Sequence, residues 1–216
     1  PMKLYQANLS MFAAPIRIQT YWKGVALEFL DPPGGLQSPE YLAINPTGKV
    51  PCLVDGDFVL PESEVIMEYI EDKFPARSLR PADPKVHAKQ RLLNRLIDLY
   101  VYPPMARLFP QLSFKGRDQT VIDAALADMD KGLARLEAFI EGPKYAVGGQ
   151  MSLSDCTLPP QLFFPVTLLP RFGREDALAK SPKLKAYYAA IAQEPPVAKV
   201  LGEMGAALAE NMKKRA

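Results

Sequence analysis

Apolar residues in the first third of the chain change between the period of strands and the period of helices. Lys3–Ala7 and Ala26–Leu30 alternate as strands do, and Ile16–Gly24 between them has helical spacing and ends at a glycine. A helical stripe of Val65, Ile66, Tyr69 and Ile70 returns within Glu62–Phe74. The pattern therefore predicts a strand, a helix and a strand, with a further helix at the end.

A hairpin is predicted between the second strand and the last helix. Pro51–Val54 and Asp57–Leu60 are short apolar runs of strand character, and they flank Asp55-Gly56. This dipeptide is a strong signal for a tight two-stranded turn. The predicted order in this part is therefore β-α-β, then a β-hairpin, then α.

The rest of the chain is helical in pattern. Residues 75–84 are polar, contain three prolines and have no period, which is typical of a linker. Five helical runs follow, at His87–Leu99, Val121–Ile140, Leu153–Leu169, Pro182–Ala192 and Val197–Met212. We therefore predict an α/β domain over residues 1–76, a linker over 77–84 and an all-helical domain over 85–216.

Composition and charge narrow the class of protein. Hydrophobic residues make up 48% and charged residues 23%, and 26 basic against 24 acidic residues give a net charge of +2. The basic residues are scattered, so we expect no nucleic-acid partner. The most apolar stretch, Leu158–Pro170, is too short to span a bilayer and carries four prolines, so we expect no membrane association.

The two cysteines and the single histidine indicate the redox environment of the protein and whether a metal site is expected. Cys52 and Cys156 match neither a disulfide framework nor a zinc site, which favours a reducing, cytoplasmic setting. His87 is the single histidine, so sites that need two histidines are excluded and we expect no metal.

Three short segments carry residues that could bind a small ligand. A cis Val50–Pro51 bond would turn the Val50 N–H and C=O outward to pair with a peptide ligand, whereas an ordinary trans proline would only begin the strand. Glu62 and Ser63 begin a helix, where they suit an ammonium group and a carboxylate, unless they only cap it. Ser10 also precedes a helix, and its hydroxyl is either free for a ligand or a plain cap.

Together these segments resemble a known family. The run Asn45–Pro75, NPTGKVPCLVDGDFVLPESEVIMEYIEDKFP, is similar to the glutathione-binding core of the soluble (cytosolic) glutathione transferases, and so are Leu4-Tyr5, Ser10 and Arg17-Ile18 before it. The resemblance implies an α/β plus all-α fold, with a thioredoxin-like N-terminal domain (βαβ-ββα) and an all-helical C-terminal domain. It points to a serine-type, bacterial-like member.

The second half of the chain supports the same resemblance. Met151–Cys156 is similar to the family's helix-capping box, with Ser152 as the cap and Asp155 three residues later. Pro159-Pro160 departs from the pattern, because one proline is familiar in that helix and two should kink it more.

The resemblance implies a role for each residue of the ligand segments. Ser10 would be catalytic, with its hydroxyl donating a hydrogen bond to the glutathione sulfur. The residues that would bind glutathione are Lys49 at the glycyl carboxylate, Val50 and cis Pro51 at the cysteinyl unit, and Glu62 and Ser63 at the γ-glutamyl end. Asp98 would reach the partner's ligand across a dimer.

A second, apolar pocket would hold the other substrate, a small hydrophobic electrophile. For each residue proposed for this pocket, a place in the plain core is the more common alternative. The candidates are Met11, Phe12, Tyr102, Met105 and Phe109.

The implied activity is that of an enzyme that binds glutathione as co-substrate, needs no other cofactor, and transfers alkyl or aryl groups to the thiolate. The alternatives are a non-catalytic glutathione-binding or scaffolding member, or a glutathione-dependent lyase, isomerase or peroxidase. The residues after Ser10 lack the serine- and cysteine-rich run of zeta-class members, which speaks against zeta-type isomerisation. A thiol–disulfide oxidoreductase would need a cysteine near position 10, and there is none.

We predict a homodimer from the resemblance and from the helix at Ala88–Tyr100. Leu92, Leu96 and Leu99 form one stripe, while Leu93 and Ile97 widen the apolar surface, so one side can pack inside its domain and the other against a second copy. Sedimentation at micromolar concentration should therefore show a dimer. A clean monomer would indicate that the helix serves only its own bundle.

Overall fold

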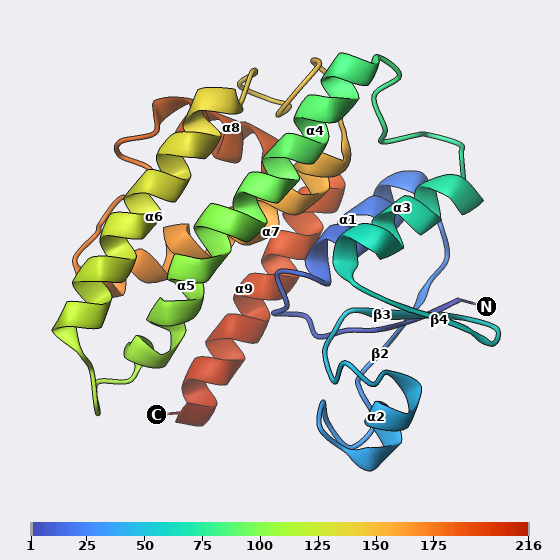
Figure 1. Cartoon of the computed structure of the whole chain (residues 1–216), viewed down its shortest axis with the longest axis horizontal. Coiled ribbons are helices and arrows are strands. Elements are labelled where there is room, and N and C mark those ends of the chain that lie inside the picture. Colours follow the sequence, from blue (N-terminus) through green and yellow to red (C-terminus); the bar gives the residue numbers. More distant parts are fainter. Residues whose placement is uncertain (1, 216) are drawn as a thin grey trace. The chain divides into compact units, whose positions relative to one another are not determined.

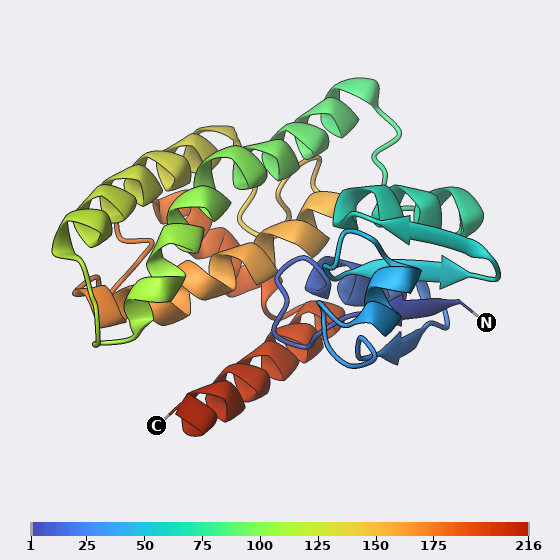
Figure 2. The ribbon, with the colours of Figure 1, turned by 60° about the horizontal axis from the view of Figure 1, so that its bottom comes forward.

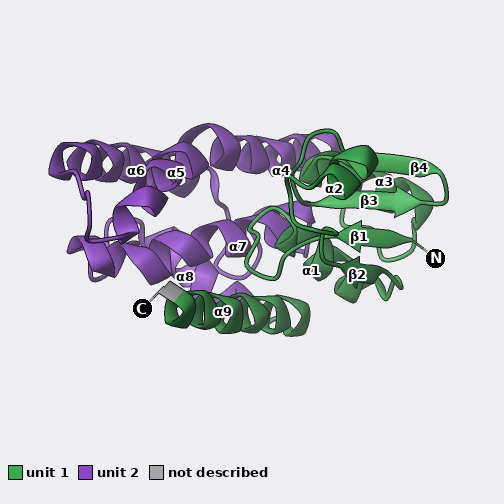
Figure 3. Cartoon of the chain, turned by 90° about the horizontal axis from the view of Figure 1, so that it is seen from below, with its two compact units in different colours: residues 1–80, 194–216 green, residues 81–193 purple. Residues whose placement is uncertain are grey.

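The structure is a computed structural model that describes residues 2–215, and its contacts divide the chain into two compact units (Figure 3). Unit 1 comprises residues 1–80 together with 194–216, and unit 2 comprises residues 81–193. Unit 1 contains the mixed sheet and unit 2 contains helices only, so the predicted α/β plus all-α fold is confirmed.

A four-stranded sheet forms the centre of unit 1. Its strands run in the order β2-β1-β3-β4, with β1 parallel to β2 and antiparallel to β3. The bounds are β1 Lys3–Tyr5, β2 Glu28–Leu30, β3 Cys52–Asp55 and β4 Phe58–Pro61. In the predicted hairpin Asp55 pairs with Phe58, so the two loop residues are Gly56 and Asp57, and Gly56 takes the left-handed φ of 66° that the turn needs.

Four helices accompany the sheet. α1 and α3 lie together on one side of it (Figure 1), and α9 packs along α1 (Figure 2). The sequence pattern did not predict α2, a six-residue helix that begins after Ser38, whose hydroxyl accepts the Tyr41 N–H at 3.0 Å. The bounds are α1 Ala14–Lys23, α2 Pro39–Ile44, α3 Ser63–Lys73 and α9 Pro195–Arg215.

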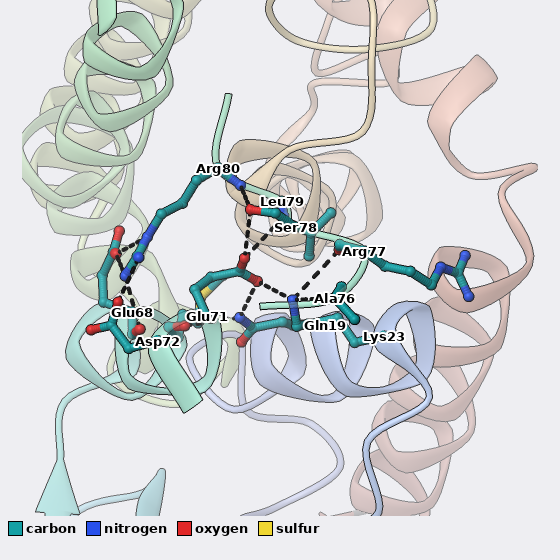
Figure 4. Close-up of polar contacts among 11 residues, drawn as sticks. Gln19, Lys23, Glu68, Glu71, Asp72, Ala76, Arg77, Ser78, Leu79 and Arg80 are labelled. Atoms are coloured by element: carbon teal, nitrogen blue, oxygen red, sulfur yellow. Dashed lines mark hydrogen bonds and ion pairs between the residues drawn. The ribbon is translucent and has the colours of Figure 1, made fainter. Parts of the chain in front are cut away.

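A buried carboxylate ties α1 and α3 to the segment that leaves α3 (Figure 4). Glu71 accepts hydrogen bonds from Gln19 at 3.0 Å, from the Ser78 hydroxyl at 3.1 Å and from the Leu79 N–H at 3.0 Å. The ammonium of Lys23 lies 3.1 Å from the same carboxylate, and the two side chains are 0% and 1% exposed. Because a charge buried this deeply needs a partner, these contacts fix the end of α3 against α1.

Unit 2 consists of helices packed around α7, which is buried along most of its length. The helix predicted over His87–Leu99 keeps α-geometry only to Leu96 and continues as a π-helical turn, Ile97–Val101. The α-helices are α4 Pro84–Leu96, α5 Tyr102–Leu108, α6 Gln119–Phe139, α7 Leu153–Leu168 and α8 Pro182–Ile191, with short 3-10 turns at Phe109–Leu112 and Leu169–Phe172.

The capping box predicted at the start of α7 is present. Asp155 accepts the Ser152 N–H at 2.9 Å, the Ala146 N–H at 2.9 Å and the Tyr187 hydroxyl at 2.9 Å. Burial raises the pKa of Asp155 to about 6, although these donors oppose the shift. α7 itself runs on through Pro159, Pro160 and Pro165.

A close approach of backbones explains one glycine in unit 2. A Cβ atom on Gly132 of α6 would lie 2.1 Å from the Tyr100 carbonyl oxygen in the π-helical turn. Only glycine allows α6 to pack this closely against that turn.

Candidate functional site

Ser10 lies in the turn between β1 and α1, and its hydroxyl oxygen accepts hydrogen bonds within that turn. Ser10 Oγ accepts hydrogen bonds from the N–H groups of Phe12 at 3.3 Å and Ala13 at 3.1 Å. A serine hydroxyl has two acceptor lone pairs and one donor hydrogen, so these two bonds leave the hydrogen available for donation. Ser10 therefore caps this turn, and donation from its hydroxyl to a ligand stays a prediction.

Ser63 connects this turn to the start of α3. Its hydroxyl donates to the Phe12 carbonyl oxygen at 2.6 Å, so Ser63 does not cap its own helix. The bond joins residues 51 positions apart and brings the predicted catalytic segment next to a predicted binding segment. Ser10 and Ser63 are thus brought together by Phe12, whose N–H bonds one serine and whose carbonyl bonds the other.

Glu62 precedes α3 in an unusual backbone conformation. Its φ is 74° and its ψ is 117°, in a region that non-glycine residues rarely occupy, and the residue is exposed. A conformation of this kind costs about 1–3 kcal/mol and is found preferentially at functional sites. It turns the chain from β4 into α3 beside Ser63.

The loop before β3 presents a free stretch of backbone. The Val50–Pro51 bond is cis, as the resemblance implied, and within the described residues the N–H and C=O of Val50 take no hydrogen bond. The preceding Lys49 carbonyl is held by the Tyr41 hydroxyl at 2.6 Å and by the Asn45 amide at 2.9 Å. The loop is therefore fixed just before the residue whose backbone groups are available.

Cysteine does not supply a reactive group at this loop. Cys52 follows Pro51 directly and is fully buried. Burial raises the pKa of its thiol to about 11, so the thiol stays protonated at neutral pH. Any thiolate chemistry at this site depends on a thiol supplied by the ligand.

The candidate residues of the apolar pocket are divided between the two units. In unit 1, Met11 is buried and Phe12 is half-buried in the Ser10 turn. In unit 2, Tyr102 begins α5, Met105 is buried on the same helix, and Phe109 packs edge-on against Phe164 at 5.3 Å. Their role in holding a second substrate stays a prediction.

Several residues that hold the site were not predicted to do so. Asn45 and Tyr41 fix the Lys49 carbonyl, and Arg17 contacts the backbone ahead of Ser10. Arg17 and Asn45 both lie in segments that resemble the family, but no function was predicted for either residue from the sequence. Their complete burial is the signal that identifies them, and burial is visible only in the folded chain.

The described part of the chain contains no helix with both the length and the apolar character needed to cross a bilayer. Within the same residues, no group of three or more potential metal-binding side chains lies together.

Comparison with known proteins identifies both units. Residues 4–78 match the family model described as "Glutathione S-transferase, N-terminal domain", and residues 92–195 match "Glutathione S-transferase, C-terminal domain". The chain is 30% identical to a glutathione S-transferase of Pseudomonas putida, over 96% of this chain and 94% of the relative. It is 31% identical to a maleylacetoacetate isomerase of Pseudomonas aeruginosa, over 91% of this chain and 100% of that protein.

A solved structure shows the same architecture with a ligand. The glutathione S-transferase of Methylobacillus flagellatus, determined with GSH bound, superposes with a TM-score of 0.77 and 26% identity, over 93% of this chain and 98% of that one.

Replacing Glu62 by glycine should not destabilise the protein. Glycine accepts a φ of 74° without strain, so Glu62→Gly should change the free energy of unfolding by about 0 to +1 kcal/mol despite the greater freedom of the unfolded chain. The matched control is Glu64→Gly, inside the first turn of α3, which should lose about 1 kcal/mol. Denaturant titration measures both variants, and equal losses would contradict the strain at Glu62.

Proposed function

The chain belongs to the glutathione S-transferase family and is a glutathione-dependent enzyme, and we propose that it adds the glutathione thiolate to a small hydrophobic electrophile, transferring alkyl or aryl groups. The observation that carries this proposal is the Ser10 turn. Two backbone N–H groups fix the Ser10 oxygen and leave its hydrogen to be donated. A donor held in this way stabilises a thiolate and contributes little to binding a neutral thiol.

The binding mode that we propose for glutathione uses three fixed features of residues 1–76. The available N–H and C=O of Val50 pair with the cysteinyl unit of the tripeptide as an added strand would. When glutathione binds, the Ser63 hydroxyl turns from the Phe12 carbonyl and donates to the γ-glutamyl carboxylate, together with the first-turn N–H groups of α3, and Glu62 receives the ammonium group. The exposed Lys49 pairs with the glycyl carboxylate.

The energy required of Ser10 is modest. A free thiol has a pKa near about 8.5, and lowering it by two units corresponds to about 2.7 kcal/mol. A hydrogen bond to a charged group contributes about 1.5–3 kcal/mol, and a nearby helix N-terminus adds about 0.3–1 kcal/mol. Side-chain and backbone donors of this turn therefore suffice to ionise the thiol at neutral pH.

The second substrate and the assembly complete the proposal. We assign the electrophile to the apolar side chains of Met11, Phe12, Tyr102, Met105 and Phe109, and we retain the homodimer. One relative is a maleylacetoacetate isomerase, which makes glutathione-dependent isomerisation the second candidate. The segment after Ser10 carries no further serine or cysteine as far as Pro15, which favours conjugation.

The electrophile class is tested directly. Purified protein is assayed with glutathione against aryl halides, hydroperoxides, β-aryl ethers and maleylacetoacetate, alongside calorimetric titration of glutathione alone. Turnover of an aryl halide supports the proposal, isomerisation alone supports the second candidate, and binding without any turnover supports a scaffolding role.

Ser63→Ala should weaken glutathione binding by about tenfold or more. The variant removes the hydroxyl whose hydrogen bonds Phe12 in the free protein and makes a charge-assisted contact of about 1.5–3 kcal/mol with the carboxylate when glutathione binds. The control is Ser78→Ala, in the same unit, which loses the bond to Glu71 and the bond from the Arg80 N–H instead. Calorimetric titration of all three proteins gives the affinities, and an unchanged affinity for Ser63→Ala would remove Ser63 from the binding site.

Ser10→Ala should lower turnover by about one to two orders of magnitude while leaving glutathione affinity much less affected. The expected loss follows from about 1.5–3 kcal/mol of thiolate stabilisation. Ser10→Thr keeps the hydroxyl and should retain most of the activity. As a control for lost caps, Asp118→Ala also removes two backbone bonds at a helix start and should leave the kinetics unchanged.

Steady-state kinetics and the ultraviolet absorbance of the bound thiolate measure these effects. Full turnover and normal thiol ionisation in Ser10→Ala would show that Ser10 only caps the turn.

A further inference from the structure

Arg17 is a cation buried inside unit 1. Its side chain is 1% exposed, and its guanidinium donates to the Gln6 side-chain oxygen, to the Ala7 carbonyl at 3.3 Å and to the Asn8 carbonyl at 3.0 Å. Its Nε lies 3.2 Å from a carboxylate oxygen of Glu203 on α9. One planar group therefore joins the segment that leaves β1 to a helix almost 200 residues later in the chain.

The backbone that Arg17 holds is the backbone that sets the position of Ser10. The Ala7 carbonyl accepts the Arg17 guanidinium and also the Ser10 N–H, at 2.9 Å. The Gln6 amide, which accepts from Arg17, donates in turn to the Asn8 side chain at 3.1 Å. Movement of the guanidinium would therefore shift the carbonyl to which Ser10 is bonded.

The two carboxylate oxygens of Glu203 contact different partners. One oxygen lies 2.9 Å from the Lys199 ammonium and 3.5 Å from the Tyr21 hydroxyl. The other faces Arg17. Lys199 also lies over the Tyr21 ring, 5.0 Å from its centroid. With one oxygen engaged by Lys199 and Tyr21, the other forms an ion pair with the guanidinium, whose buried Nε makes no hydrogen bond to any described residue.

Because the guanidinium of Arg17 is buried, the opposite charge of Glu203 is important to it. Desolvation lowers the pKa of the guanidinium, and the charge of Glu203 opposes that shift. A buried cation without its carboxylate would turn toward another acceptor or toward water, and its planar fork cannot turn without giving up the Ala7 and Asn8 carbonyls.

We propose that Arg17 and Glu203 are positioning residues for the thiol-activating serine: Glu203 of α9 fixes the guanidinium, and the guanidinium fixes the backbone that orients Ser10. The inference rests on the proposed function, because it assigns a task to these residues within the same reaction. Neither residue touches the sulfur in this scheme, and α9 becomes a required part of the activating turn.

The test measures how readily the bound thiol ionises. Glu203→Gln keeps the shape of the side chain but removes its charge, so the pKa of bound glutathione, followed by thiolate absorbance, should rise by about half a unit to one unit. Turnover at pH 6.5 should then fall by about two- to fivefold and recover toward the wild-type value near pH 9, where the thiol ionises without help. Arg17→Lys should shift the thiol pKa in the same direction, because an ammonium group cannot reach both carbonyls and α9.

Glu210→Gln is the matched control, because Glu210 pairs with Lys214 on the same helix but is 67% exposed, and it should leave the thiol pKa unchanged. An unchanged or lowered thiol pKa in Glu203→Gln would overturn the inference, since a fall would show that the carboxylate acts by its charge alone. An equal loss of turnover at every pH would also overturn it. If glutathione bound to the wild-type protein forms no thiolate, the proposed function fails and the inference fails with it. If bound glutathione does ionise in the wild type, the variants test the role of Glu203 alone.

Discussion

A buried guanidinium needs hydrogen-bond acceptors and an opposite charge, and Arg17 finds them in two separate parts of unit 1. The strand exit provides Gln6 and two backbone carbonyls, and α9 provides Glu203. Further along α1, Gln19 and Lys23 contact Glu71 of α3. Because a buried charge without its partner lies in a medium that solvates it poorly, the contacts of Arg17 and Glu71 favour the burial of α1 together with α3 and α9. The arrangement of unit 1 follows from that requirement.

The candidate site uses backbone more than side chains. Ser10 is oriented by two N–H groups, Ser63 by a carbonyl, and Val50 by the fixed carbonyl of the residue before it. Backbone groups held by short polar contacts keep their geometry at little entropic cost when a ligand arrives. The site is therefore largely formed before a ligand binds.

Much of this could be predicted from the sequence, because strands, long helices and turn residues are encoded locally. Asp55-Gly56 located the hairpin, and Ser152 with Asp155 located the start of α7. The short α2 was missed because its six residues have no apolar stripe, and Tyr41 is its only buried residue. The pattern left Ser63 as a ligand contact or a cap, and it could not show that the hydroxyl reaches Phe12. It placed the last helix in the second domain, whereas Glu203 of α9 contacts Arg17. These contacts join distant segments, and no local period encodes them.

The placement of α9 affects how the chain can fold during synthesis and how it can be divided. Residues 194–215 are synthesised after all of unit 2. Arg17 can therefore pair with Glu203 only after more than a hundred intervening residues have been made. Unit 1 is consequently a domain in space but not a continuous segment of sequence. A fragment that stops at Arg80 would contain every strand of the sheet and yet expose the face of α1 that α9 covers, so a circularly permuted chain that places α9 next to the first strand is the natural form in which to isolate this unit.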